Sequence, residues 1–332
     1  MSKDDHPSRA LHGAVQSSFH GFLDAFEPLR PELFRYCRHL TSSPWDAEDL
    51  AQDTMARAFV TLGCMSEPPP NPRAWLFRVA SNLWIDRVRH ARLETRSARG
   101  VGDASEPATA TDPRAPREAA ATLIGRLSPQ ERAAVVLKDA FDLSLEEIAD
   151  ALTTTPNAVK AALHRGRGKL VEPPREVERV PAAGVVDAFC EAFNARDLER
   201  LTALLLDSAT IEVVGVHTEW GPEAARKGVY VGMLYGSKRM HESETRGGMD
   251  PSRKSGVLPD SPRVEVRVHR GEALLVHWYK HDDGEYVRAI TRLEAEGDQV
   301  RVVRNYFFTP DFLADLCGEL GVPFHDNGYR YW

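Results

Sequence analysis

Residues 127–170 have the sequence LSPQERAAVVLKDAFDLSLEEIADALTTTPNAVKAALHRGRGKL, which contains the starts of three short helices. Ser128 and Glu131 stand three residues apart, and the same spacing recurs at Ser144 and Glu147. A serine followed at this distance by a glutamate forms the capping box that begins a helix. A threonine-proline pair begins the third helix directly after a tight turn. The pattern predicts a helix-turn-helix, a motif that places its last helix in the major groove of DNA.

The last of these helices carries most of the basic side chains of the segment. We therefore expect two groups of DNA contacts, to base edges from Asn157, Lys160, Ala161 and His164 and to phosphates from Arg165, Arg167 and Lys169. Gly166 and Gly168 lie in its last turns, where a glycine costs roughly 1 kcal/mol relative to alanine. The end of the helix should therefore fray unless another element packs on it.

Helical patterns also precede this segment. In SPWDAEDLAQDTMARAFVTL, residues 43–62, a serine cap, a proline and an aspartate begin a predicted helix from Pro44 to about Leu62. After the break SEPPPNPR, the sequence WLFRVASNLWIDRVR, residues 75–89, continues as a helix with one apolar face. Another helical pattern starts near Phe19, and residues 1–18 show no sustained periodicity.

Acidic residues form a stripe on the first of these two helices. Three of them follow the i, i+3, i+7 spacing of one helix face, and a glutamine lies beside them. This acidic stripe consists of Asp46, Asp49, Gln52 and Asp53. A charged stripe is usually a solvated face, and the alternative is a surface that binds a basic partner.

The next helix collects cationic and polar groups along one face. Such groups can hold the phosphates and unstacked bases of a melted DNA strand. The candidates are Arg78, Asn82, Trp84, Asp86, Arg87 and Arg89. In the alternative, Asn82 and Asp86 only bond each other and the arginines are solvated. We expect Trp75 in the core, whereas Trp84 lies either in the core or on a surface beside the melted strand.

Three of these segments resemble segments of one protein family, and they occur in the same order along the chain. WLFRVASNLWIDRVR resembles the promoter-opening segment of extracytoplasmic-function (ECF) sigma factors, whose usual form is W-L-x-x-I-A-x-N-x-x-x-D-x-x-R. DAEDLAQDTMARAF resembles the preceding core-polymerase-binding helix, and residues 127–170 resemble the C-terminal DNA-binding module of the family. The resemblance covers roughly Leu33 to Leu170.

The resemblance implies partners for each segment. It implies that the acidic stripe binds the basic clamp of the β′ subunit of core RNA polymerase, and that the helix-turn-helix binds the −35 promoter element and the β flap. It also implies that residues 75–89 open the −10 element. Many relatives have Ser-Arg after the lysine of the third helix, whereas this chain has Ala161-Ala162, which predicts weak or unusual base readout.

Composition divides the chain into segments. Residues 97–120 are rich in Ala, Ser, Gly, Pro and Thr, and residues 171–181 carry prolines and charges, so both predict linkers. We expect a flexible segment at 1–18, an all-α bundle at 19–96 and an all-α helix-turn-helix domain at 121–170. The third domain, at 182–332, is expected to be α+β.

The C-terminal domain starts with helical patterns and continues with β-branched and aromatic segments separated by turns, which predicts an α+β fold with a curved antiparallel sheet. The polar segment from Gly236 to Pro262 is expected to be a mobile insertion. The segments VVDAFCEAFNARDLERLTALLLDSATIEVVG and VRVVRNYFF resemble the SnoaL-like polyketide-cyclase group, which implies a cone-shaped fold with an apolar pocket. Candidates for a ligand pocket are His217, Glu219, Trp220, Tyr235, His277, Tyr279 and Tyr306. Aromatic residues on strands are also typical of a core.

Composition and motifs exclude several classes of protein. No apolar run approaches the roughly 20 residues that span a bilayer, and the N-terminus lacks the apolar segment of a signal peptide, so we expect a cytoplasmic protein. The four cysteines form no CxxC or Cys/His cluster. No nucleophile elbow, phosphate loop or catalytic dyad is present, so we expect no catalytic residue, metal or cofactor.

Charge is divided unequally along the chain. Residues 1–170 hold 22 basic and 22 acidic side chains, whereas the rest of the chain holds 20 and 27.

These observations together leave three hypotheses for the function of the chain. The chain is an ECF-type sigma factor whose SnoaL-like domain modulates it in cis; or that domain is a small-molecule-binding or isomerase/hydrolase-like enzyme coupled to transcription; or the chain is a ligand-responsive DNA-binding regulator that never joins polymerase.

Overall fold

The computed structural model describes residues 7–41, 43–98, 127–168, 183–235 and 262–329. Contacts between backbone atoms divide the chain into two compact units, Met1–Glu176 and Val177–Trp332. Within the described ranges, no helix combines the length and the apolar character needed to cross a membrane. The expected insertion at Gly236–Pro262 lies outside the described residues except for its last residue.

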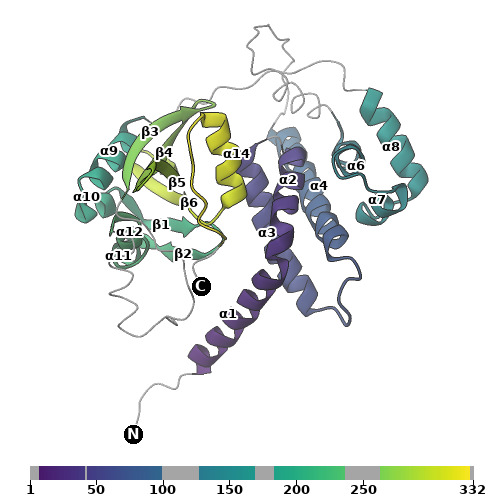
Figure 1. The fold of residues 1–332 in the computed structure, drawn as a ribbon, viewed down its shortest axis with the longest axis horizontal. Helices are drawn as coiled ribbons and strands as arrows, with labels where there is room; N and C mark the ends of the chain where they lie inside the picture. Colours follow the sequence, from purple (N-terminus) through teal and green to yellow (C-terminus); the bar gives the residue numbers. More distant parts are fainter. Residues whose placement is uncertain (1–6, 42, 99–126, 169–182, 236–261, 330–332) are drawn as a thin grey trace. The chain divides into compact units, whose positions relative to one another are not determined.

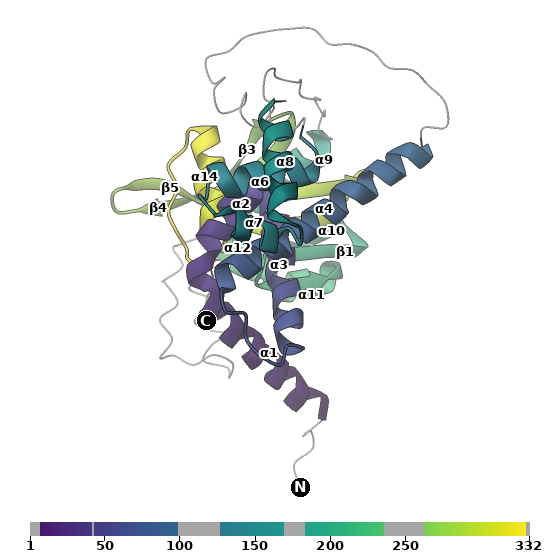
Figure 2. The same ribbon diagram turned by 90° about the vertical axis from the view of Figure 1, so that its right-hand side faces the viewer.

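The first unit begins with a helical bundle, which we define as α1 to α4. Its elements are α1 (Pro7–Phe26), a 3-10 helix (Glu27–Leu29), α2 (Arg30–Thr41), α3 (Pro44–Gly63) and α4 (Pro72–Ala98). The Ser43 hydroxyl accepts a hydrogen bond from the Asp46 amide, as the cap pattern predicts. Helix α1 begins at Pro7, whereas the lack of periodicity before Phe19 had predicted no helix there. Its first turns extend away from the other helices (Figures 1 and 2), and Leu11 and Val15 are exposed. Because this part of α1 packs against none of the other described helices, its sequence shows no apolar periodicity.

The helix-turn-helix module follows in the same unit. It consists of α6 (Pro129–Asp139), α7 (Leu145–Ala151) and α8 (Pro156–Gly168). Both predicted capping boxes are present, at Ser128 with Glu131 and at Ser144 with Glu147. Each satisfies backbone donors that a helix start leaves unpaired.

Helices α6 and α8 pack closely at Gly166. A β-carbon added there would lie 2.9 Å from Cγ2 of Val135, so the position leaves no room for a side chain. The glycine that weakens α8 as an isolated helix is thus the residue that lets α6 pack on it. Helix α6 is therefore the element that packs on the last turns of α8 and opposes their fraying.

The second unit is an α+β fold with one six-stranded sheet. Its elements in chain order are α9 (Ala183–Asn194), α10 (Leu198–Ala203), β1 (Leu205–Val213), β2 (His217–Trp220), α11 (Gly221–Lys227), α12 (Val229–Tyr235), β3 (Arg263–His269), β4 (Glu272–His281), β5 (Gly284–Glu296), β6 (Gln299–Tyr306) and α14 (Pro310–Leu320). The strand order is β2-β1-β6-β5-β4-β3. Figure 1 shows α14 on the other side of the sheet from α9 and α10.

The sheet is mixed, and the prediction of a purely antiparallel sheet is wrong at one pair of strands. Strands β1 and β6 run parallel, with Ile211 opposite Val303. They are distant in sequence, and the long connection between them permits either direction. Alternation along a strand records which face is buried and carries no information on the direction of its neighbour.

Candidate functional site

The acidic stripe on α3 presents its carboxylates outward. Asp46 and Asp53 are exposed, and Asp49 is half-buried. Glu48, the other acidic residue in this part of the sequence, points inward: its side chain is 2% exposed and pairs with Arg30 at 3.2 Å. Gln52 donates a hydrogen bond to Glu48 Oε1, so it is held by the buried carboxylate. The stripe therefore exposes the carboxylates of Asp46 and Asp53 on the outer face of α3.

Arg87 lies beside this stripe and not beside Arg78. Its guanidinium pairs with the Asp53 carboxylate and donates to the backbone carbonyl of Asp49 at 3.4 Å. Arg87 follows Arg78 by nine residues, which is two and a half helical turns, so the two side chains leave α4 on opposite sides. The structure thus places Arg87 on the side of α4 opposite Arg78.

The remaining polar residues of α4 follow one face. Asn82 and Arg89 are exposed, and the Asp86 carboxylate accepts a hydrogen bond from Arg89 at 3.1 Å. Arg78 donates to Asp150, which belongs to α7 of the helix-turn-helix module. One arginine of the expected DNA face is therefore held within the unit by a carboxylate of the other module.

Both tryptophans of α4 are buried. Trp75 is 8% exposed and lies near Phe26, as expected of a core residue. Trp84 is 6% exposed, and the guanidinium carbon of Arg132 lies 5.1 Å from the centre of its ring. Burial lowers the pKa of Arg132 to about 10, and its Nη1 donates to the Leu40 carbonyl at 2.5 Å. In this conformation α6 covers Trp84, so its ring lies in the core and not on an open surface.

Phe141, in the turn between α6 and α7, joins the helix-turn-helix module to the bundle. Its ring lies 5.7 Å from Tyr36 and 5.1 Å from Phe77 in edge-on geometry. The Arg73 guanidinium lies 5.9 Å from the same ring. Aromatic pairs at these distances are attractive beyond the area that they bury. The two modules of the first unit are therefore packed together along α2, α4, α6 and α7.

Helix α8 exposes the residues that were expected to meet base edges. Those that point to solvent are Asn157, Lys160, Ala161 and His164. Arg165 is exposed as well, and its Nε donates to Oε1 of Glu131 at 3.1 Å. Arg167 pairs with Asp139 of α6, which raises its pKa through the hydrogen bond to that carboxylate. Lys169 lies outside the described residues.

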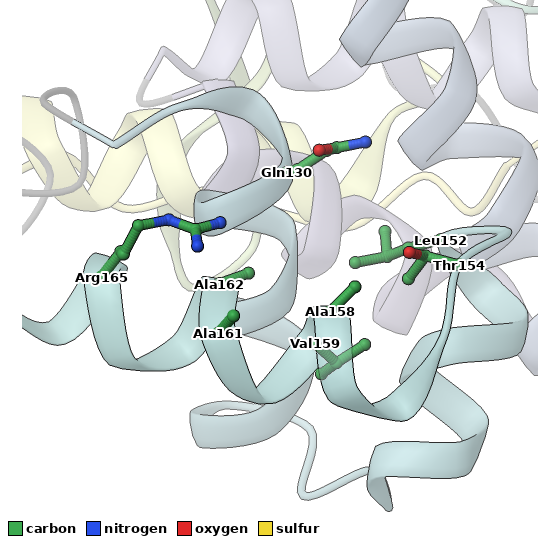
Figure 3. A pocket seen from close by; sticks show the side chains of 8 residues that line it. All are labelled: Gln130, Leu152, Thr154, Ala158, Val159, Ala161, Ala162 and Arg165. Atoms are coloured by element: carbon green, nitrogen blue, oxygen red, sulfur yellow. The ribbon is translucent and has the colours of Figure 1, made fainter.

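A groove of about 230 Å³ runs along α8 beside these residues. Figure 3 shows side chains from the start of α6, from the turn after α7 and from α8 around one space. It is lined by Gln130, Leu152, Thr154, Ala158, Val159, Ala161, Ala162 and Arg165. The alanine pair that departs from the family pattern thus forms part of the wall of a groove.

The second unit brings three of the candidate pocket residues near one cation. Tyr235 and Tyr279 act electrostatically on Arg196, and the charge of Arg196 lowers the pKa of His277, so all three side chains lie within electrostatic range of its guanidinium. Arg196 itself donates to the carbonyls of Phe193 and Pro262. Sequence reasoning missed Arg196 because it is an isolated arginine in a turn after α9, and only the tertiary fold brings it to β4.

His277 is a neutral, buried group. Its side chain is hydrogen-bonded to Thr291 Oγ1 at 2.8 Å, and Asn305 donates to the same hydroxyl at 2.9 Å. Burial, and then the charge of Arg196, lower the pKa of His277 to about 3. Its ring packs edge-on against Phe193 at 5.1 Å. Burial also raises the pKa of Tyr279. Both side chains are therefore parts of the core, which was the alternative left open for aromatic strand residues.

The other candidates of this unit lie elsewhere. His217 pairs with Glu219 at 3.1 Å, and Glu219 accepts a hydrogen bond from the Val229 amide at the start of α12. Trp220 is 71% exposed and is not part of an enclosed pocket. Tyr306 is fully buried and stacks on Phe312 of α14 at 4.4 Å. The seven candidates therefore do not form one site.

Comparisons with known proteins match the first unit. The model of sigma-70 region 2 matches residues 25–94, and that of sigma-70 region 4 matches residues 117–170. The chain is 31% identical over 140 residues to the ECF RNA polymerase sigma factor SigL of Mycobacterium tuberculosis, covering 40% of this chain and 76% of SigL.

Two longer matches come from the same organism. The chain is 30% identical over 221 residues to the ECF RNA polymerase sigma factor SigG, covering 56% of this chain and 60% of SigG. It therefore spans about three fifths of the length of that relative. The crystal structure of the extracytoplasmic function sigma factor SigJ is similar at 24% identity and a TM-score of 0.31, over 88% of this chain and 98% of that chain.

Proposed function

We propose, because this chain belongs to the ECF family of RNA polymerase sigma factors, that it directs core RNA polymerase to specific promoters and initiates transcription there. The observation that carries the proposal is the exposed acidic stripe of α3, in one unit with a helix-turn-helix module whose last helix exposes Lys160 and His164. An anionic and a cationic surface on one unit suit two partners of opposite charge.

Each surface has one role in this proposal. Asp46, Asp49 and Asp53 bind the basic clamp of the β′ subunit, with Gln52 beside them. Arg78, Asn82, Asp86 and Arg89 on α4 hold the melted strand of the −10 element. Helix α8 enters the major groove of the −35 element, while the module around it meets the β flap. Arg87 belongs to the polymerase-binding side because it pairs with Asp53.

The first unit must open before it can use the α4 face. Arg78 is paired with Asp150, and Trp84 lies beneath Arg132, so the helix-turn-helix module occupies part of the surface assigned to the −10 element. The −10 and −35 elements are separate stretches of DNA, and two modules in contact through Phe141 cannot lie on both. Core polymerase therefore selects an open arrangement, a shift in population that its own binding energy drives.

The second unit modulates this activity in cis. Its sequence carries the acidic excess of the chain, which favours contact with the basic surfaces of the first unit. The buried side chains of His277 and Asn305 both form hydrogen bonds with the hydroxyl of Thr291. A histidine whose pKa is about 3 is a poor proton acceptor near neutral pH, so His277 is not suited to act as a general base there.

Run-off transcription tests both parts of the proposal. Purified core polymerase with the full chain should transcribe from a promoter selected by the resulting holoenzyme, and a chain truncated after Val171 should give a different rate. Asp53→Lys should lower the affinity for core polymerase, because it reverses the charge on the acidic stripe. A chain that never co-purifies with core polymerase would instead be a conventional DNA-binding regulator, and equal rates from the full and truncated chains would refute modulation in cis.

A further inference from the structure

The groove along α8 has an apolar wall on the face proposed to meet DNA. Ala158 and Ala161 are exposed and direct their methyl groups into it, and the buried Ala162 continues the wall (Figure 3). Leu152 and Val159 also line it, together with the polar side chains of Gln130, Thr154 and Arg165. A group that enters this groove therefore meets the methyl groups of the alanines on one side and polar side chains beside them.

The surroundings of the groove are cationic and fixed in place. Arg165 stands at the rim, where its Nε donates to Glu131 Oε1 at 3.1 Å. The Glu131 side chain is 5% exposed, and its other oxygen accepts a hydrogen bond from the Ser128 amide at 2.9 Å. The carboxylate that closes the capping box of α6 thus also holds Arg165. Lys160 and His164 of the same helix are exposed as well. This charge is complementary to DNA and not to an apolar peptide.

Among the base edges in the major groove, thymine carries a distinctive apolar group, its 5-methyl, and alanine is one of the residues that contact it. We propose that the groove takes the 5-methyl group of a thymine in the −35 element, with Arg165, held by Glu131, beside it. The inference rests on the proposed function, since it requires α8 to lie in the major groove. Ala158 and Ala161 thereby become determinants of promoter specificity, in place of the basic side chain absent at Ala162.

Substitution of deoxyuridine for thymine tests the proposal, because it removes only the methyl group. The holoenzyme is first used to select its promoter from a pool of random DNA, and each thymine of the −35 element is then replaced in turn. Replacement at one position should weaken binding about fourfold, the factor that corresponds to one buried methylene group. An element without thymine, or one in which no replacement weakens binding more than about twofold, overturns the proposal.

Variants of the chain locate the contact on α8. Ala158→Gly and Ala161→Gly each remove one methyl group, and their cost in helix stability applies equally to both DNAs and cancels in the ratio of affinities. In at least one of them the penalty for deoxyuridine should disappear. Ala140→Gly, an exposed position at the far end of α6, should keep the full penalty.

The outcomes separate the inference from the function on which it rests. If both groove variants keep the penalty of the unaltered chain, the methyl contact lies elsewhere and the inference is wrong, while promoter binding stands. If no complex forms with core polymerase, or the complex retains no DNA, the proposed function fails and the inference fails with it.

Discussion

Substitution of Gly166 by alanine should destabilise the helix-turn-helix module, although alanine is the better helix former. The new β-carbon would lie 2.9 Å from Cγ2 of Val135 and 3.6 Å from Cβ of Glu131. Carbon atoms in contact normally lie 3.5 to 4.0 Å apart, so α8 or Val135 must move by several tenths of an ångström. Overpacking of this kind costs about 1 to 3 kcal/mol, and the helix preference returns about 1 kcal/mol. We expect a net loss of up to about 2 kcal/mol.

Hydrogen exchange of the amides in α6 and α8 measures this loss without requiring the whole chain to unfold in one step. The variant should exchange up to about 30-fold faster in both helices, the factor that corresponds to 2 kcal/mol. Gly21→Ala is the matched control: Gly21 lies within α1, nothing stands within 4 Å of an added β-carbon, and slower exchange is expected.

A second substitution identifies the contact responsible. Val135→Ala removes the methyl group that the new β-carbon would meet, so the double variant should be less destabilised than the sum of the two single variants by about 1 kcal/mol. The reasoning is refuted if Gly166→Ala slows exchange as Gly21→Ala does, or if the two substitutions in the module act independently.

Three further outcomes are expected. Asp150→Asn should raise the affinity of the free chain for single-stranded −10 DNA by up to about fivefold, because Arg78 is released from a half-exposed ion pair. Asp142→Asn removes the same charge from the module and should leave this affinity unchanged. Equal effects of the two substitutions would contradict the role of the Arg78–Asp150 pair. Glu48→Ala should lower the free energy of unfolding of the bundle by about 3 kcal/mol, since it removes the carboxylate that pairs with the buried Arg30 guanidinium. Urea titration followed by tryptophan fluorescence checks this. The folded state depresses the pKa of His277 to about 3, below its unfolded value near 6.5, so the unfolded chain binds the additional proton and the second unit should lose stability as pH falls through this interval. His277→Gln should reduce that loss in thermal unfolding between pH 7 and 4, and an unchanged slope would contradict the assignment.

Much of the first unit was predictable because its signals are local. The serine caps and their partners three residues later lie within one helical turn, so Ser128 and Ser144 mark helix starts whatever surrounds them. The predicted helix from Pro44 to about Leu62 is observed as Pro44–Gly63 for the same reason. The buried Val159 and Leu163 of α8 are four residues apart, the spacing of one helix face, which is also a local signal.

The candidate pocket in the second unit was less predictable. His277 and Tyr279 are two residues apart, so the alternation of a strand places both on one side of β4, but this period cannot show whether that side faces a cavity or a packed core. The answer depends on Phe193 of α9 and on Arg196, which reach β4 from distant positions in the chain. Trp220, which stands between Glu219 and Gly221, is exposed, whereas Tyr306, which is followed by Phe307 and Phe308, is buried.

The sequence by itself determined the helix starts, the helix-turn-helix, the acidic stripe and the α+β character of the second unit, because caps, periods and charge spacing act between near neighbours. Only the tertiary structure decided that Arg78 pairs with Asp150, that Arg87 belongs with Asp53 and that β1 runs parallel to β6. It also showed why position 166 is a glycine: the residue lowers the stability of an isolated helix, but it leaves the space that Val135 occupies. These features join residues far apart in the chain, where the energy depends on distances that no local pattern records.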